Sequence, residues 1–266
     1  MRSTTAPRRA LAGSARRLRR SMCLSALALI GAVPTSAAAH ATPALRATAS
    51  PRHVLATIDT PHVNPAGNRT LSEATLMACN TAPSATACTG QVLAAIDAAR
   101  ASEGVAPMRL PANFLTLSAA QQFLVLADLE RVARGLTPAI GLSPSLNRRA
   151  LLGARADTDP NLEPLYGNWA GANWAGGFRS PLEADFAWMY DDGPGSSNRD
   201  CIAGGQAGCW GHRDNILAAY ESPLAMGAAV DGMSMAEMFV GHDLQTGRHQ
   251  PDALTGPCWP AVISHR

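Results

Sequence analysis

The stretch from residue 188 to residue 217 constrains the fold more than any other part of the chain. It carries an aromatic helix end, a glycine-rich loop with the close pair Cys201 and Cys209, and then the motif Gly-His-Arg-x-Asn-Ile-Leu around His212. Loops held on a rigid support are frequent sites of function. The fold must hold this loop in place, and His212 is the first candidate functional residue.

The cysteines predict an oxidising compartment. Cys79 and Cys88 form a second close pair, flanked by turn residues like Cys201 and Cys209. In an oxidising compartment such pairs form local disulfides. Zinc is the alternative, but no spacing resembles a four-ligand cluster. We therefore predict two disulfides, no metal and no cofactor, and Cys258 is left without a predicted partner.

Residues 1–41 resemble an export signal. Seven arginines in the first twenty residues precede an apolar run, residues 22–33, and then small residues. The run is too short for a transmembrane helix, which needs about 20 residues. We expect a secreted, extracellular protein without a transmembrane segment. The Arg19-Arg20 pair leaves two export routes open, the general one and the twin-arginine one, and a basic cytosolic tail is the alternative reading.

The charge of the remaining chain excludes some partners. Without those seven arginines, 15 basic residues stand against 20 Asp and Glu. A mildly acidic body argues against binding to nucleic acid or to an anionic membrane. The apolar fraction of 47% is ample for a packed core. The chain is therefore expected to be a globular exported protein.

Composition and periodicity divide the chain into five parts. They are a signal peptide (1–41), a disordered linker rich in Pro, Thr, Ala and Ser (42–75), an N-terminal helical extension (76–114), a main domain (115–243) and an irregular C-terminal tail (244–266). The order of secondary structure in the main domain then indicates its fold class.

Helix signals precede a hairpin signal along the chain. Helices are predicted after Cys88, from Ser118 with a capping box, from Ser143-Pro144 and from Ser180-Pro181. A hairpin is predicted about an Asp-Gly turn at residues 231–232. This order indicates an α+β domain. The ends of the first two helices, with Glu-Gly-Val-Ala-Pro and Arg-Gly-Leu-Thr-Pro, are compatible with a duplication.

Five segments in matching order resemble the CAP superfamily (the cysteine-rich secretory, antigen 5 and pathogenesis-related proteins), in its bacterial, exported SCP-like branch. They are residues 130–138, 146–154, 187–189, 211–217 and the 227–241 hairpin. The resemblance covers residues 115–243. It implies an α-β-α sandwich with a small antiparallel sheet and a solvent-facing groove.

Typical members of this family place two histidines and two acids in the groove, and some bind a divalent metal. His212 matches the second histidine, and Asp191 matches the acid at a helix end. The usual Gly-Glu-Asn-Ile-Ala appears as Gly-Ala-Asn-Trp-Ala over residues 171–175, so its acid is missing. The first histidine has no counterpart, because that region offers only Asp157 and Asp159. Half of the tetrad is missing, which favours a site without metal.

The leading prediction is a non-catalytic binding module for a lipid, glycan or other envelope component, including a protein. Its predicted ligand groove comprises Trp174, Trp188, Trp210, His212 and Asn215. One alternative is a hydrolase of peptide or cell-envelope substrates that uses His212 and Asp191. Another is a structural envelope or assembly protein. A lone histidine can also simply fix its own loop, and the oligomeric state is left open.

Overall fold

A computed structural model describes residues 64–83, 86–162, 170–220 and 223–241, all of which belong to one compact unit. The predicted signal peptide and C-terminal tail, with Cys258, lie outside the described residues. Among the described residues no helix has both the length and the hydrophobicity needed to cross a bilayer.

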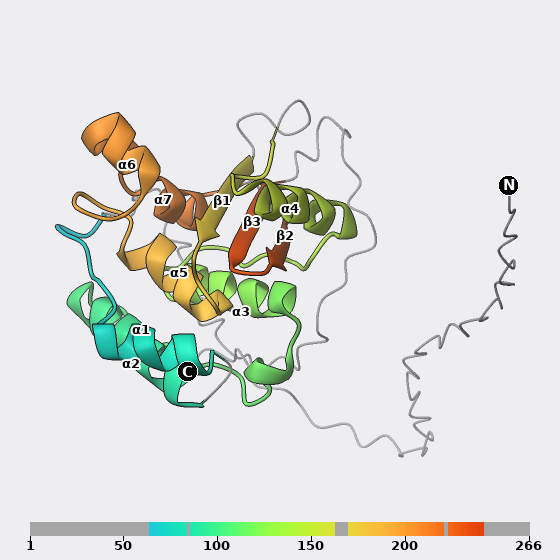
Figure 1. The fold of residues 1–266 in the computed structure, drawn as a ribbon. Helices are drawn as coiled ribbons and strands as arrows, with labels where there is room; N and C mark the ends of the chain where they lie inside the picture. Colours follow the sequence, from blue (N-terminus) through green and yellow to red (C-terminus); the bar gives the residue numbers. More distant parts are fainter. Residues whose placement is uncertain (1–63, 84–85, 163–169, 221–222, 242–266) are drawn as a thin grey trace, which may run out of the picture. The chain divides into compact units, whose positions relative to one another are not determined.

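A three-stranded antiparallel sheet forms the middle layer (Figure 1). Its strands, in the spatial order β1-β3-β2, are β1 (Ala170–Gly176), β2 (Leu224–Asp231) and β3 (Ser234–Gly241). The predicted hairpin is confirmed, with β2 and β3 meeting at the Asp231–Ser234 pair. Gly232 in the turn has a φ of 65°, a conformation that favours glycine.

One face of the sheet is covered by α4 (Pro144–Ala156), which begins at the predicted proline. Its inward residues Leu146 and Ala150 pack in clusters with Met238 and Ala236 of β3. Gly227 of β2 lies directly under this helix, and a Cβ there would collide with the backbone of Leu146. Small residues therefore bring the helix close to the sheet.

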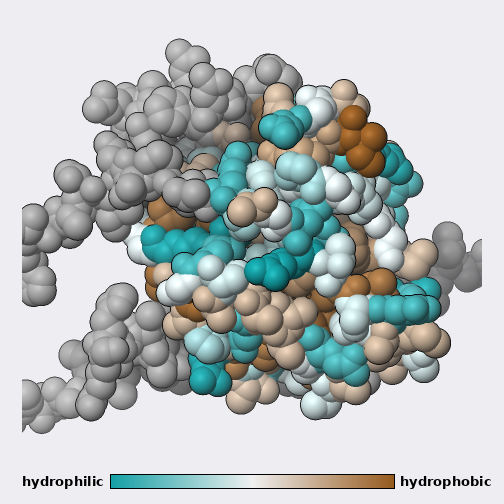
Figure 2. All heavy atoms as spheres, turned by 90° about the vertical axis from the view of Figure 1, so that its left-hand side faces the viewer, coloured by the Kyte–Doolittle hydropathy of each residue, from teal (hydrophilic) through white to brown (hydrophobic). Residues whose placement is uncertain are grey.

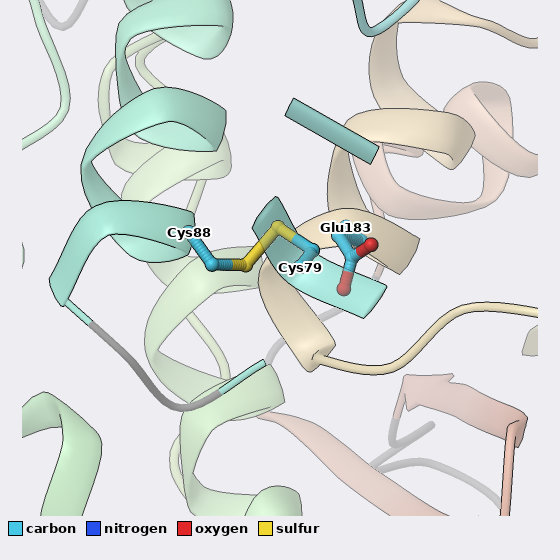
Figure 3. A group of neighbouring side chains, drawn as sticks. All are labelled: Cys79, Cys88 and Glu183. Carbon is cyan, nitrogen blue, oxygen red and sulfur yellow. A yellow bond between two sulfur atoms is a disulfide. The ribbon is translucent and has the colours of Figure 1, made fainter. Parts of the chain in front are cut away.

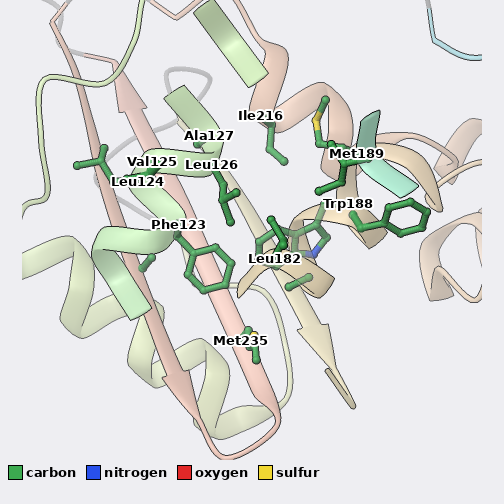
Figure 4. Close-up of a cluster of buried hydrophobic side chains, with 14 of the residues drawn as sticks. Phe123, Leu124, Val125, Leu126, Ala127, Leu182, Trp188, Met189, Ile216 and Met235 are labelled. Atoms are coloured by element: carbon green, nitrogen blue, oxygen red, sulfur yellow. The ribbon is translucent and has the colours of Figure 1, made fainter. Parts of the chain in front are cut away.

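The opposite face carries the larger core. The face is covered by α3 (Ala119–Val132), α5 (Pro181–Tyr190) and α7 (Gly211–Leu217). Two further elements belong to the same core, namely α2 (Thr86–Ser102), which packs against α5, and η1 (Phe114–Thr116). Along β3, Met235 and Phe239 enter this core, while Ala236 and Met238 face α4. Figure 4 shows part of the cluster, including Phe123, Leu126, Leu182, Trp188, Ile216 and Met235. Helices on both faces of the sheet confirm the predicted α+β, α-β-α sandwich.

Local capping follows the sequence at two helices. Ser118 and Gln121 form the predicted capping box of α3. Ser180 accepts a hydrogen bond from the backbone of Glu183 at the start of α5. Such caps satisfy backbone N–H groups that have no partner within the helix. Both helices begin where short-range chemistry places them.

The described part of the predicted linker, residues 64–75, contains the start of a helix. Helix α1 (Glu73–Thr81) begins inside the 42–75 segment and is capped by Ser72, whose hydroxyl accepts from the backbone of Thr75. The predicted Cys79–Cys88 disulfide joins α1 to α2 (Figure 3). Both cysteines lie in the same core cluster as Phe123 of α3. The helical extension and the main domain therefore share one core.

The ends of α2 and α3 form two matching turns, here called the α2 turn (residues 97–108) and the α3 turn (residues 128–139). In each, an aspartate accepts from the backbone N–H eleven residues ahead, at 2.7 Å. In each, an arginine Nε donates to the carbonyl six residues ahead, at 2.7 and 2.8 Å. Each contains one left-handed glycine, Gly104 and Gly135, at φ of 73° and 76°. The repeated sequence thus builds a repeated hydrogen-bond pattern.

The outer edge of β2 is paired with the segment that leads into α4. Ile140 donates its backbone N–H to Leu224 at 2.8 Å, and Ser143 donates to Met226 at 2.9 Å. Met226 in turn donates to Gly141 at 3.0 Å. These three bonds cover the strand edge along part of its length.

The glycine-rich loop folds into two short helices, α6 (Arg199–Gly204) and η3 (Gly205–Gly208), which the sequence did not predict. The predicted Cys201–Cys209 disulfide closes them into one small unit, with a Cα–Cα distance of 4.2 Å. Asn198 caps α6 by accepting from the backbone of Asp200. This unit stands directly before α7, which carries His212.

Candidate functional site

His212 lies in the first turn of α7, and its ring is fixed by Asp192. Its Nδ1 lies 2.6 Å from Oδ1 of Asp192, and its backbone N–H donates to Oδ2 of the same carboxylate at 2.9 Å. Because an ionised carboxylate only accepts, Nδ1 is assigned the proton. The other ring nitrogen, Nε2, is left for a ligand.

Asp192 is buried and receives several donors besides His212. Arg213 donates its backbone N–H to Oδ2 at 3.3 Å, and Asn198 donates its side-chain nitrogen to Oδ1 at 2.7 Å. Burial disfavours a charged imidazole, but the hydrogen bond and the negative charge of Asp192 outweigh it. The pKa of His212 is therefore raised above its usual value.

His212 is held by Asp192 and not by Asp191, the acid that the sequence analysis assigned to the groove. Asp191 is the C-cap of α5, half-buried, and its Oδ1 has no hydrogen-bond partner among the described residues. Burial, together with the charge of Asp192, raises the pKa of Asp191 to about 6. Consecutive side chains at a helix end point in different directions, so the neighbouring aspartate takes the place facing the ring.

A groove of about 430 Å³ opens beside His212. Its wall carries five acids, namely Asp157, Asp159, Asp191, Asp192 and Asp200, together with Arg199, Trp174 and Trp188. The five carboxyl groups outnumber the cationic groups, so the groove is acidic. On the face that carries α6, hydrophilic side chains gather in a band across the described surface (Figure 2).

Trp174 forms the aromatic part of the groove wall. Its Nε1 donates to Oγ of Ser234 at 2.7 Å, which fixes the ring on the sheet. The guanidinium of Arg199 lies 5.1 Å from the ring centroid. This distance is within the range of a cation–π contact. Arg199 thereby connects α6 to β1 across the groove.

Three of the five predicted groove residues line it, namely Trp174, Trp188 and His212. Trp188 is 2% exposed and packs against Phe123 with ring centroids 5.4 Å apart, so it belongs mainly to the core (Figure 4). Trp210 and Asn215 support the site from outside the groove. The ring of Trp210 packs over Gly193, while Asn215 donates to Ala172 and Asn173. Arg199 and Asp200 were not assigned to the groove from sequence.

The sheet supports the histidine helix through Asn173 of β1. Its amide donates to the carbonyl of His212 at 3.1 Å and to Oε1 of Glu237 at 2.9 Å. Glu237 is fully enclosed, and burial raises its pKa to about 8, although the bond from Asn173 opposes the shift. A buried polar network therefore lies behind the groove.

The structure brings together three potential metal ligands that the sequence did not connect. Ligand atoms of Asp159, Asp200 and His212 all lie within 4.8 Å of one another. One imidazole and two carboxylates are donors that suit a divalent cation, and three protein ligands are the number found in catalytic zinc sites. If a divalent ion binds here, these three side chains are its ligands among the described residues, and the ion would place positive charge beside a bound oxygen.

A second group, Cys79, Cys88 and Glu183, is drawn together in Figure 3. Its two sulfur atoms are joined in a disulfide. A disulfide offers no thiolate, and thiolate is the form of cysteine that binds metals. This group is therefore structural.

Comparison with known proteins adds little. No protein-family model matches the chain, and no curated protein sequence matches it. Among solved structures, the chain is similar to an extracellular protein containing a SCP domain from Bacillus anthracis str. Ames, at 15% identity and a TM-score of 0.34. The match covers 47% of this chain and 40% of that chain, so less than half of the other protein is represented. At this level the likeness carries no argument about function.

Proposed function

We propose that the chain is an exported, CAP-like binding module whose groove beside His212 binds a glycan of the cell envelope. The main support for this proposal is the groove of about 430 Å³, which places five aspartates beside Trp174. Sugars present hydroxyl donors, which carboxylates accept, and C–H faces, which pack on an indole. On Trp174 such a sugar face would take the place of the Arg199 guanidinium. A lipid chain would require a mainly apolar lining. The groove chemistry therefore favours a glycan over a lipid.

Export is part of the same proposal. The arginine-rich and then apolar N-terminus supports secretion. The disulfides at Cys79–Cys88 and Cys201–Cys209 support an oxidising destination. The second disulfide also braces the unit that carries Arg199 and Asp200, so the groove wall depends on oxidation.

Binding of soluble envelope polysaccharide fragments by the purified chain tests the proposal, measured by calorimetry. We expect Trp174→Ala and Asp200→Asn each to weaken binding about tenfold or more, since each removes a ligand contact worth about 1.4 kcal/mol. Leu152→Ser is the matched control, because Leu152 is 64% exposed on α4 and does not line the groove. Unchanged affinity in both groove variants, or purified protein that retains lipid instead, would reject the glycan assignment.

A hydrolase is the second candidate, and one observation favours it. The 2.6 Å contact between His212 and Asp192 is the arrangement of a histidine base oriented by a carboxylate. Water would be the nucleophile, because no serine or cysteine is hydrogen-bonded to the ring in the described part of the chain. Peptide and envelope-polymer hydrolysis by His212→Ala is the discriminating measurement. Activity equal to that of the unaltered chain would end this candidate.

The structural or assembly role remains the third candidate. A stable oligomer in size-exclusion chromatography, with no ligand bound by the groove, would support it.

A further inference from the structure

An N-terminal strap, residues 64–71, lies against the elements that build the His212 site. Asn64 donates its side-chain nitrogen to Oδ1 of Asp214 in α7 at 3.2 Å. Arg69 donates its backbone N–H to the carbonyl of Tyr190, the last residue of α5, at 2.7 Å. Leu71 packs against the core at the other end. The strap is therefore attached to both helices that meet at the groove.

Between these anchors, Asn68 contacts the peptide next to the key carboxylate. Its Oδ1 accepts the backbone N–H of Gly193 at 2.6 Å. On the other side of the same peptide, the carbonyl of Asp192 accepts from Trp210 at 2.8 Å. The ring of Trp210 leaves no room for a Cβ on Gly193. The Asp192–Gly193 peptide is thus fixed by hydrogen bonds at both its N–H and its carbonyl, and by the ring of Trp210 against Gly193.

The position of this peptide determines where the Asp192 carboxylate stands. That carboxylate holds the ring and the backbone of His212. Gly193 is buried with Asn68 in place, so its N–H depends on this acceptor. A buried donor that loses its acceptor favours a rearranged backbone.

We propose that Asn68 is a positioning residue for the groove, acting through the Asp192–Gly193 peptide on the ring of His212. The strap is then a built part of the site, although it precedes the 115–243 segment in sequence. This inference is independent of which ligand the groove binds.

The proposal has a consequence for modification. Asn68-Arg69-Thr70 is an N-glycosylation sequon. The side-chain nitrogen of Asn68, the atom that would carry a sugar, is buried in the folded chain. Attachment of a sugar and the Asn68–Gly193 hydrogen bond therefore exclude each other.

The test follows the Nδ1 proton of His212 by nitrogen-15 NMR in the full chain. In Asn68→Ala we expect this proton to exchange with water roughly tenfold faster, the change that loss of one hydrogen bond to a buried group produces. Asn68→Asp keeps an acceptor oxygen in the same place and should restore slow exchange. Thr70→Ala removes the sequon, leaves Asn68 in place and should behave like the unaltered chain.

A role in general stability alone would lower the melting temperature and leave the His212 proton unchanged, and that result would overturn the proposal. The same exchange rate in Thr70→Ala as in Asn68→Ala would also overturn it. If Asn68→Ala does not fold, Asn68→Asp decides the question. Slow exchange in that variant supports positioning, and fast exchange contradicts it.

Discussion

The α2 turn and the α3 turn share their local hydrogen bonds and differ in what they hold. In both, an aspartate, an arginine and a left-handed glycine fix the chain that leaves the helix. The α2 turn joins one helix to the next. The α3 turn joins the core to the end of the helix that carries His212. The same local sequence thus serves two different tasks.

The two turns differ in the partners of the Nη1 atom of each guanidinium. Nη1 of Arg100 donates to Oε2 of Glu130 at 2.9 Å, a carboxylate that also receives Arg134 and Tyr190. Nη1 of Arg131 instead donates to the carbonyls of residues 216 and 218, at 2.6 and 2.9 Å. These carbonyls lie at the C-terminus of α7, where a cation complements the helix dipole.

Replacing Arg100 and Arg131 should give the largest difference in unfolding free energy between the two turns. Arg131→Ala leaves buried carbonyls without their charged donor, and we expect a loss of about 4 kcal/mol of unfolding free energy. Arg100→Ala should cost about 2 kcal/mol, because Glu130 keeps two other partners. Denaturant unfolding measures both, with Arg109→Ala, an exposed site, as a control that changes little. Equal losses at Arg100 and Arg131 would contradict the comparison.

The aspartate of the α3 turn should make stability depend on pH. Burial raises the pKa of Asp128 to about 7, against the opposing bond from Ala139 and the charge of Arg131. The folded chain therefore keeps a proton that the unfolded chain releases, and stability falls as pH rises from about 4 to about 7. At about 1.4 kcal/mol for each pKa unit, a shift of about three units makes the fall attributable to Asp128 about 4 kcal/mol.

Asp128→Asn checks this by denaturant unfolding at several pH values. It keeps the acceptor for Ala139 and should flatten that part of the pH profile. Asp128→Ala, which also removes the acceptor, should be less stable than Asp128→Asn at every pH. A profile of unchanged slope in Asp128→Asn would show that this carboxyl is ionised in the folded chain throughout.

The glycines should behave alike in both turns. Gly104→Ala and Gly135→Ala each force an alanine into the left-handed region, at a cost of about 1 kcal/mol. The Cβ added at Gly104 meets no atom within 4 Å, so the cost there is the backbone alone. Gly90→Ala, inside α2 and with equal space, should instead stabilise by about 0.5–1 kcal/mol. Opposite signs at Gly104 and Gly135 in thermal unfolding would show that the turns are not equivalent.

The parts of the fold that could be predicted depend on short-range chemistry. The capping residues Ser118 and Ser180, the Asp-Gly turn and the two cysteine pairs each act within about ten residues. The turn repeat was visible for the same reason. No helix was predicted before Cys88, whereas α1 begins three residues inside the predicted linker, continues into the predicted helical extension, and is held by a disulfide and the shared core.

The site could be predicted only in part, because its geometry is long-range. His212 was found from its motif, but choosing between Asp191 and Asp192 requires the exact end of α5. Asp159 follows α4 and Asp200 lies in α6, and the two come together only when these distant segments pack side by side in the fold. Trp188 lines the groove as predicted, but its near-complete burial could not be predicted, because α5 is buried nearly all round and periodicity does not reveal which face meets solvent.

The bonds between residues 140–143 and β2 have a consequence for association between copies of the chain. An open strand edge is a template on which another chain can add a strand. Here Ile140 and Ser143 donate to the edge carbonyls of Leu224 and Met226, and Gly141 accepts the N–H of Met226. Adding a strand to this sheet at Leu224 and Met226 of β2 would first require the lead-in to α4 to detach, so the segment hinders fibre-like growth at that part of the edge.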